Sequence, residues 1–150
     1  MKIIFIGFFC AGKTTHGIKY AKEKDLHFFD TDDLIEERFK LPVYEVYHKY
    51  GEEKFREIEH EILCSIDESE AVIATGGGTP MSEENQKLLK EMGELIYLEA
   101  PFQTLYKRIL NRRFPSFADP SDPYASCEKI YHYRHPIYSN LADKTIDTKD

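Results

Sequence analysis

Short apolar runs alternate along the chain with longer stretches in which apolar residues recur at helical spacing. The runs are apolar at successive positions rather than at every second one, which is typical of strands buried on both faces of a sheet. We expect strands at Ile3–Ile6, His27–Phe29, Ala71–Ala74, Leu95–Leu98 and, from a weaker signal, Lys144–Asp147. Because such strands alternate with helices, the pattern predicts a parallel sheet in a three-layer α/β fold.

The stretches between these runs carry helix start and stop signals. A stripe of apolar residues three or four apart follows Glu52, Gly51 is typical of the position just past a helix end, and Ser82 is a typical N-cap. Prolines and aspartates in 114–123 predict a loop, and Pro136 predicts a kink in the last helix. We expect helices at about 13–23, from 31 onward, at 43–50, 52–66, 82–92, 101–112 and 124–141.

The composition indicates one globular domain that is built to bind neither nucleic acid nor membranes. The chain has 150 residues, with 20 Lys and Arg against 27 Asp and Glu, for a formal net charge of −7. This acidic excess argues against a surface that neutralises a phosphate backbone. The apolar run Ile3–Phe9 is far too short to span a bilayer, and the N-terminus lacks a signal-peptide layout. Three cysteines without CxxC spacing suit reduced thiols, so we expect a cytoplasmic protein.

The strongest chemical signal is the octet G-F-F-C-A-G-K-T at Gly7–Thr14, which fits G-x-x-x-x-G-K-[ST] between a predicted strand and a predicted helix. Backbone N–H groups of such a loop surround phosphate oxygens at the helix N-terminus. We expect Lys13 to reach the β and γ phosphates of a nucleotide, and the Thr14 hydroxyl to bind Mg²⁺. The residues expected to hold the nucleotide are Cys10, Ala11, Gly12, Lys13, Thr14 and Thr15.

Acidic residues follow the second predicted strand, in the segment Asp30-Thr31-Asp32-Asp33. Ligands of open α/β sheets bind at this end of the strands, where one carboxylate serves to hold Mg²⁺ and another to orient or deprotonate an acceptor hydroxyl. Helix capping is the alternative, since Asp and Thr are ordinary at helix starts. Next to a phosphate loop we favour a functional role for Asp30 and Asp32, and we assign Asp33 to the helix dipole.

Arg56 lies in an acidic helical segment, Glu52–Glu59. Its spacing fits an i,i+4 pair with Glu52 or an i,i+3 pair with Glu59. On pattern alone we expect such a pair on a solvated helix face, with little effect on stability.

Arg134 presents a different pattern, because it falls inside an apolar stripe of the last predicted helix, formed by Ile130, Ile137 and Leu141. A guanidinium on an inward-facing stripe must find an anion or remain poorly satisfied. A functional anion, a buried pair with a structural Glu and a snorkelling side chain all stay open.

A run of glycines, Gly76–Gly78, follows the predicted strand at 71–74. Three glycines are more than a tight turn requires, and they allow a ligand to approach the backbone closely, so we favour a binding site. His132 and His135 are three residues apart, but the sequence offers no completing Cys or carboxylate, and we expect polar side chains there rather than a zinc site.

With these motifs in hand, the chain from Lys2 to about Asp147 resembles the shikimate kinases, small P-loop kinases of the nucleoside-monophosphate-kinase type. The resemblance covers five motifs in family order: the octet at Gly7–Thr14, F-x-D-T-D-x-x-I-E at Phe28–Glu36, G-E-x-x-F-R-x-I-E at Gly51–Glu59, T-G-G-G at Thr75–Gly78 and Y-R-x-P-I-Y at Tyr133–Tyr138. It implies ATP- and Mg²⁺-dependent phosphorylation of the 3-hydroxyl of shikimate, a step of aromatic amino-acid biosynthesis.

The resemblance also implies an architecture and a set of partners. It predicts one P-loop kinase domain over 1–150, with helices on both faces of a five-stranded parallel sheet in the order 2-3-1-4-5. An acceptor-binding region at about 31–60 and a mobile lid at about 112–123 are implied. The expected partner is shikimate, with no nucleic acid and no membrane, and the expected state is a monomer.

Carried over by position, the family's roles fall on residues already singled out. Asp32 would contact the acceptor hydroxyl, and Arg56 and Arg134 would hold the shikimate carboxylate. Gly77 and Gly78 would line its ring. The resemblance further assigns the orientation of the first arginine to Glu59 and a share in Mg²⁺ binding to Asp30.

Two positions depart from the family pattern. Cys10 stands in the phosphate loop where the family usually has glycine. The family's lid arginine directly precedes a proline, whereas the order here is Arg112-Arg113-Phe114-Pro115. We assign the catalytic role to Arg113, which is nearer to the proline, and Arg112 is the alternative.

Two other functions fit the same residues. One is a kinase for another small carboxylate polyol such as gluconate, because paired arginines suit any small carboxylate; a nucleoside-monophosphate acceptor would want arginines as well. The other is a nucleotide-binding protein of this fold that has lost catalysis, a reading supported by Cys10 and by the displaced lid arginine. Against it, Lys13 and Asp32 are retained together with both arginines.

Overall fold

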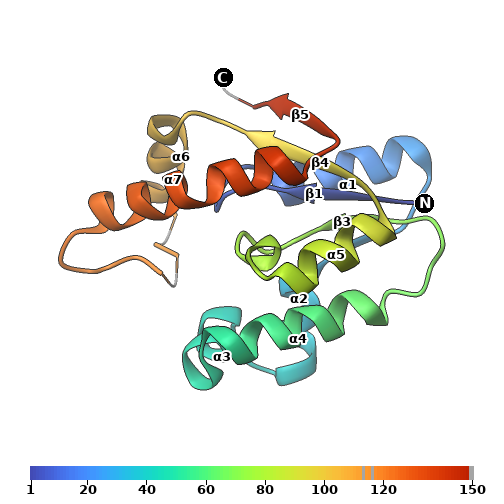
Figure 1. The fold of residues 1–150 in the computed structure, drawn as a ribbon, viewed down its shortest axis with the longest axis horizontal. Coiled ribbons are helices and arrows are strands. Elements are labelled where there is room, and N and C mark those ends of the chain that lie inside the picture. The colour runs from blue at the N-terminus through green and yellow to red at the C-terminus, as the bar shows by residue number, and fades with distance from the viewer. Residues whose placement is uncertain (113, 116, 149–150) are drawn as a thin grey trace.

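The computed structural model describes residues 1–112, 114–115 and 117–148. Its centre is a five-stranded sheet in the order β2-β3-β1-β4-β5, in which every neighbouring pair is parallel. This confirms the predicted sheet and its strand order (Figure 1). The strands are β1 (Lys2–Ile6), β2 (Phe28–Asp30), β3 (Val72–Ala74), β4 (Gly93–Glu99) and β5 (Lys144–Asp147).

The helices follow the predicted pattern closely. Ser82 caps its helix as expected, with its side chain accepting from the N–H of Asn85, and Gly51 separates two helices at a left-handed φ of 84°. A short 3₁₀ helix, η1, was not predicted. The helices are α1 (Lys13–Lys24), α2 (Thr31–Phe39), α3 (Val43–Tyr50), α4 (Glu52–Ser65), η1 (Thr79–Met81), α5 (Glu83–Met92), α6 (Phe102–Leu110) and α7 (Pro123–Leu141).

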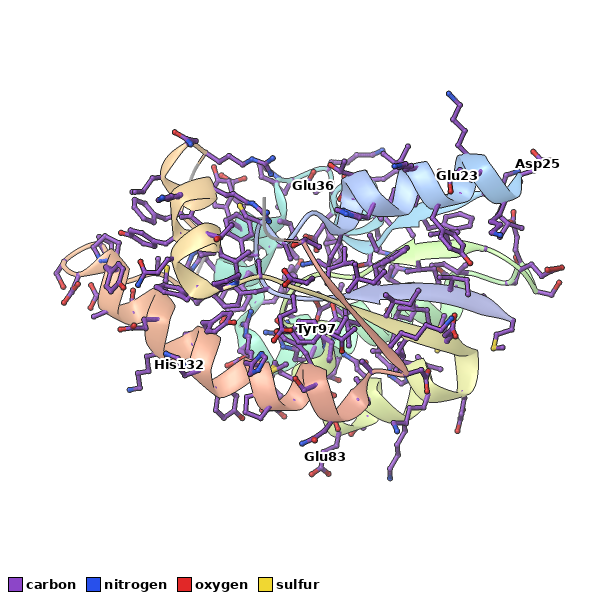
Figure 2. All side chains as sticks on the ribbon, turned by 90° about the horizontal axis from the view of Figure 1, so that it is seen from above. Glu23, Asp25, Glu36, Glu83, Tyr97 and His132 are labelled. Carbon is purple, nitrogen blue, oxygen red and sulfur yellow. The ribbon has the colours of Figure 1, made fainter. Side chains whose placement is uncertain are left out.

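The sheet lies between two helical layers. Figure 2 shows α1 and α6 on one face, and α5 and α7 on the other. The central strand β1 is buried at its end, where Ile4, Phe5 and Ile6 are at most 2% exposed. Continuous apolarity therefore marked a strand that is covered on both faces, as parallel sheets require. β5, by contrast, is an exposed edge strand.

Residues 31–65 form a separate layer beyond the β2 edge of the sheet, built from α2, α3 and α4 (Figure 1). These helices share a small apolar cluster of their own, which consists of Ile35, Val46, Phe55, Ile58 and Ile62. The cluster holds the helices together beside the carboxyl ends of β2 and β3. Among the described residues, no helix is both long and apolar enough to cross a membrane.

Candidate active site

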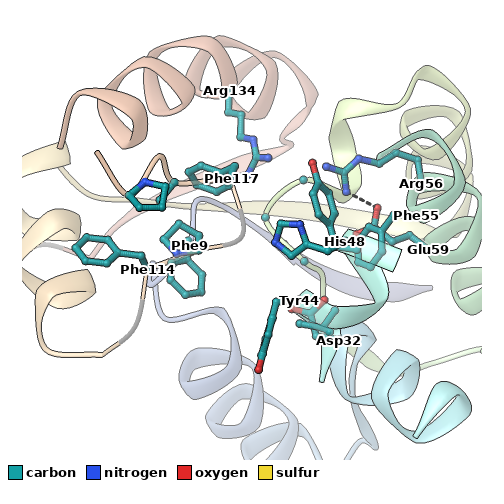
Figure 3. A pocket seen from close by; sticks show the side chains of 18 residues that line it. Phe9, Asp32, Tyr44, His48, Phe55, Arg56, Glu59, Phe114, Phe117 and Arg134 are labelled. Carbon is teal, nitrogen blue, oxygen red and sulfur yellow. Dashed lines mark hydrogen bonds and ion pairs between the residues drawn. The ribbon is translucent and has the colours of Figure 1, made fainter. Parts of the chain in front are cut away.

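A cavity of about 530 Å³ lies at the carboxyl ends of the central strands, where open α/β sheets bind ligands. Its walls come from the loop after β3, from α2 to α4, from α7 and from the segment between α6 and α7 (Figure 3). The lining residues are Phe9, Asp32, Val43, Tyr44, Tyr47, His48, Phe55, Arg56, Glu59, Gly76, Gly77, Gly78, Phe114, Pro115, Phe117, Ala118, Pro120 and Arg134.

The predicted phosphate loop joins β1 to α1 beside this cavity. Gly12 has a left-handed φ of 95°, which a glycine adopts without strain, and α1 begins at the next residue. The ammonium of Lys13 donates to the carbonyl oxygens of Gly7 (2.7 Å) and Phe8 (3.0 Å). Burial lowers the pKa of Lys13 to about 8, although nearby Asp32 raises it in part. The loop thus carries a lysine folded over its own backbone, at the N-terminus of a helix.

Cys10 has a backbone conformation that is unusual for a residue other than glycine. Its φ is 67°, in the left-handed region that Cβ atoms disfavour. The guanidinium of Arg108 on α6 donates to the Cys10 carbonyl oxygen (3.1 Å), and the Arg112 side chain interacts with the thiol. Burial raises the pKa of this thiol. The loop is therefore strained at the position where the family usually has glycine, and it is held by contacts from α6 and the residues just after it.

Asp30 performs two of the proposed tasks at once. Its Oδ1 accepts from the backbone N–H groups of Asp32 (2.9 Å) and Asp33 (3.4 Å), which caps α2. Its Oδ2 accepts from the Thr14 hydroxyl (2.7 Å), so the carboxylate also faces the phosphate loop. The capping and functional interpretations of Asp30 are thus compatible. Asp33 lies exposed in the first turn of the helix, as expected for a residue that acts on the dipole.

Asp32 lies at the base of the cavity, one residue into the helix that Asp30 caps. Burial, together with the charges of Asp30 and Glu59, raises the pKa of Asp32 from 3.8 to about 7, and Lys13 opposes the shift. A carboxyl group with such a pKa exchanges its proton near neutral pH, which is what a general base requires. The position and the pKa both suit a group that accepts a proton from a bound hydroxyl.

Arg56 forms both of the ion pairs that its spacing predicted. Its Nη1 donates to Glu59 (2.8 Å) and its Nη2 to Glu52 (3.3 Å). The expected solvated face is wrong, however: the side chain of Arg56 is only 12% exposed and that of Glu59 only 1%. The helix turns this pair toward the cavity rather than toward water. Among the described residues the Nε of Arg56 is buried and has no hydrogen-bond partner.

Arg134 reaches the same cavity from α7, and Figure 3 shows its guanidinium and that of Arg56 directed toward one space. Arg134 is 7% exposed, and its guanidinium carbon lies 4.7 Å from the centre of the Phe117 ring. Its side chain hydrogen-bonds with the Tyr138 hydroxyl. Within the described part of the chain no carboxylate forms an ion pair with it. Of the three interpretations of Arg134, the structure favours a cation that awaits an anionic ligand.

The three glycines lie where these side chains meet. A Cβ atom on Gly76 would stand 2.9 Å from a carboxylate oxygen of Asp32, and one on Gly77 would stand 3.3 Å from Nη1 of Arg134. On Gly78 it would collide with the guanidinium of Arg56, at 2.2 Å from Nη2. The glycine run therefore lets charged side chains approach the backbone that follows β3.

Further residues support the site without having been singled out from the sequence. The buried Tyr138 hydroxyl donates to the Gly77 carbonyl, and the Thr79 hydroxyl donates to Glu59 (2.6 Å). The amide of Asn85, which is fully buried, donates to the Thr79 carbonyl (3.1 Å). The sequence could have pointed to Tyr138, because it lies one helical turn after Arg134 within the motif at Tyr133–Tyr138. No sequence pattern indicated the contacts of Thr79 and Asn85.

The other expected residues lie mostly at the edge of the cavity. Thr14 and Thr15 are exposed in the first turn of α1, and Ala11 is buried in the loop. Arg113, to which we assigned the catalytic role in the lid, lies outside the described residues. None of the described residues forms a group of three or more His, Cys, Asp or Glu side chains suited to a metal ion.

Comparison with known proteins agrees with this geometry. A protein-family model described as shikimate kinase matches residues 9–150. The chain belongs to the shikimate kinase family. Its relatives include a shikimate kinase of Aromatoleum aromaticum, 35% identical over 98% of this chain and 85% of the relative. Another is a shikimate kinase of Phocaeicola vulgatus, 37% identical over 92% of this chain and 82% of the relative.

A solved structure extends the agreement to the fold. Shikimate kinase from Acinetobacter baumannii, determined in complex with shikimate, superimposes with a TM-score of 0.89 and 29% identity, over 99% of this chain and 84% of that one. Membership of the family makes the chain a small-molecule kinase that uses ATP. The kinase fold and the predicted family are both confirmed.

Proposed function

We propose that this chain transfers the γ-phosphoryl group of ATP to the 3-hydroxyl of shikimate, and that the residues described above carry out the transfer. The observation that carries the proposal is the arrangement of two guanidinium groups, of Arg56 and Arg134, that face one cavity above the carboxyl group of Asp32. A small ring that bears a carboxylate at one end and a hydroxyl at the other matches this separation of charges.

The carboxylate of the acceptor would bind between the two arginines. Arg56 is oriented by Glu59 and lines the cavity, while Arg134 is held by Tyr138 and lacks an ion pair with any described carboxylate. Charge-assisted hydrogen bonds from two sides fix both the position and the plane of a carboxylate. Gly77 and Gly78 line the cavity beside these guanidinium groups, and the ring would lie next to them.

Asp32 would receive the proton that the acceptor hydroxyl loses. A bond forms between the acceptor oxygen and the γ phosphorus, the bond between that phosphorus and the β–γ bridging oxygen breaks, and ADP leaves with its electron pair. Because the pKa of Asp32 is about 7, it accepts the proton near neutral pH and returns it to solvent afterwards.

The loop residues 10–15 would hold the phosphates of ATP, and Lys13 would leave its two carbonyl partners to contact the β and γ phosphates. Thr14 and Asp30, whose oxygens lie 2.7 Å apart, offer the hard oxygen ligands that Mg²⁺ prefers. Mg²⁺, when bound, supplies positive charge to the phosphate oxygens. We assign the remaining positive charge to Arg113, in a lid at about 112–123 that excludes water.

A coupled assay of ADP formation tests this function. We expect ATP turnover that depends on shikimate and exceeds the rate without acceptor by at least about a thousandfold, in line with ordinary enzymatic rate enhancements. The same assay is run with gluconate and with nucleoside monophosphates. Faster turnover of one of these would assign a different acceptor, and nucleotide binding without any acceptor-dependent turnover would assign the non-catalytic function.

We further propose that residues 1–150 act as a single kinase domain and as a monomer, with residues 31–60 as the acceptor-binding region. The separate apolar cluster of α2, α3 and α4 supports this division, because it lets these helices adjust to an acceptor as a unit. Light scattering after gel filtration tests the monomer, and an apparent mass of two chains would contradict it.

A further inference from the structure

Tyr47 of α3 lines the cavity beside the two arginines, and no role has been assigned to it so far. Its ring packs edge-on against Phe55, with centroids 5.3 Å apart and planes at 69°, and it contacts the apolar cluster of α2, α3 and α4. Aromatic pairs of this kind fix the orientation of both rings. The position of the Tyr47 hydroxyl is therefore determined by packing and does not depend on a ligand.

The hydroxyl of Tyr47 is surrounded by charge. The charges of Glu52 and Glu59 raise its pKa, and the guanidinium groups of Arg56 and Arg134 lower it. Burial raises the pKa of Tyr47 above its usual value, so the hydroxyl keeps its proton throughout the neutral range and remains a donor. Within the described residues it makes no hydrogen bond, although it lines a polar part of the cavity.

A carboxylate offers about four lone-pair positions. Both Nη atoms of Arg56 already donate to Glu59 and Glu52, so the two guanidinium groups leave part of the carboxylate unsatisfied. A neutral phenol adds one directed donor without adding positive charge to a site that already holds two cations. Three groups would then surround the carboxylate: Arg56 and Arg134 supply positive charge, and the Tyr47 hydroxyl supplies a directed hydrogen bond.

We propose that the Tyr47 hydroxyl donates a hydrogen bond to the acceptor carboxylate and makes this site selective for a carboxylate over a neutral ester or amide. This inference rests on the proposed function, because it takes shikimate as the acceptor. Tyr47 acts here as a binding and specificity residue; it neither accepts nor transfers the proton of the reaction.

The variant Tyr47→Phe tests this role, since it removes the hydroxyl and keeps the ring that packs on Phe55. Its matched control is Tyr50→Phe, in the last turn of the same helix: Tyr50 is 38% exposed, packs on Phe39 and does not line the cavity. Both variants are measured for kcat, for KM of shikimate and ATP, and with the methyl ester of shikimate as acceptor. Both are expected to melt within about 2 °C of the wild type.

We expect Tyr47→Phe to raise KM for shikimate about tenfold, the usual effect of losing one hydrogen bond to a charged group, with kcat and KM for ATP unchanged. For the methyl ester, whose neutral carbonyl oxygen accepts a weaker hydrogen bond, Tyr47→Phe should raise KM by less than it does for shikimate. Tyr50→Phe should match the wild type throughout.

The possible failures are distinguishable. Wild-type turnover of shikimate with a KM for Tyr47→Phe within about twofold of the wild type would overturn the inference alone. An equal loss with shikimate and with its ester would also overturn it, because the lost contact would then not depend on the negative charge of the carboxylate. Failure of the wild type itself to phosphorylate shikimate would overturn the proposed function, and this inference with it.

Discussion

The phosphate side and the acceptor side of the site are built by different means. The phosphate loop is eight consecutive residues, and the lysine in it hydrogen-bonds to carbonyls only five and six residues away. The acceptor side brings Asp32, Arg56 and Arg134 together from α2, α4 and α7. The first therefore depends on local backbone conformation, as at Gly12 and Cys10. The acceptor side depends on the room available in the cavity and on the balance between its buried charges.

Lys13 and Asp32 connect the two sides. Burial lowers the pKa of the lysine to about 8 and raises that of the carboxyl group to about 7, and each charge partly offsets the shift of the other. Substitutions on the phosphate side should therefore act mainly on the transfer step, whereas those around the arginines should act mainly on acceptor binding.

Replacing Lys13 by Ala should have the largest effect, because it removes a fixed positive charge from the phosphates in the transition state. We expect kcat to fall by at least about a thousandfold with the fold retained. Lys19→Ala, on an exposed position of the same helix, is the control and should be fully active. Circular dichroism establishes folding, and near-normal kcat in a folded Lys13→Ala would remove Lys13 from the mechanism.

Asp32→Asn should come next, with kcat lower by about a hundredfold or more and both substrates still bound, because the amide cannot take a proton. In the wild type, kcat/KM should rise with pH through about 7, since the carboxyl group must be ionised to act as a base. A higher KM for shikimate with unchanged kcat would make Asp32 a binding residue instead.

The same variant should be more stable than the wild type at pH 8. Between pH 4 and 7 the folded protein keeps a proton on Asp32 that the unfolded chain releases, so the wild type loses stability as the pH rises. Asp32→Asn removes this cost, and we expect a higher melting temperature that returns toward the wild-type value as the pH falls to about 4. An equal difference at both pH values would contradict the shifted pKa.

Arg113→Ala and Arg112→Ala test whether the lid belongs to the phosphate side. Adjacent residues face different ways, so only one of them reaches the closed site. We expect Arg113→Ala to lower kcat by about tenfold or more while affecting either KM less, and Arg112→Ala to be mild. The reverse ranking would favour Arg112, whose side chain already meets the Cys10 thiol. Negligible effects of both would favour a non-catalytic protein.

Gly78→Ala should weaken acceptor binding without affecting ATP binding. The new methyl group would lie 2.2 Å from Nη2 of Arg56, so the guanidinium must move, and we expect KM for shikimate to rise about tenfold with KM for ATP unchanged. Gly51→Ala is the contrasting variant: the added Cβ would meet no described atom within 4 Å beyond its chain neighbours, but the φ at this position is 84°. It should lose about 1 kcal/mol of stability and leave both KM values unchanged. Equal KM values for Gly78→Ala and wild type would show that Arg56 does not hold the acceptor.

Cys10→Gly should have the smallest effect, because it changes only local strain. A glycine adopts the φ of 67° freely, and we expect the free energy of unfolding to rise by up to about 1 kcal/mol. Thermal melting measures the gain, and KM for ATP should stay within about twofold of the wild type. A lower melting temperature would mean that the thiol stabilises the loop by its contacts.

The sequence revealed most of what is local. Apolar runs located four strands and a weaker signal located the fifth, and the octet at Gly7–Thr14 lies between a strand and a helix as predicted. These features depend on residues close together in the chain, where spacing alone carries the information. The roles of the site residues themselves stay predictions.

What depends on distant packing was harder to predict. An i,i+3 pair such as Arg56–Glu59 has the same sequence pattern on a solvated face as in a cavity. Its burial depends on residues distant in the sequence, such as Thr79 and the glycines after β3. The 3₁₀ helix that carries Thr79 had no periodic signal. Tyr47 gave none either, because its relation to Arg134 arises from the packing of α3 and α7 around one cavity.

The cavity is divided in a way that matters for inhibitor design. Asp32 and Arg56 lie at one end of the cavity, whereas Phe9 and Phe114 lie toward the other end (Figure 3). A competitive inhibitor that keeps the carboxylate and extends an aryl group toward this aromatic wall would gain contact area that a small acceptor leaves unused.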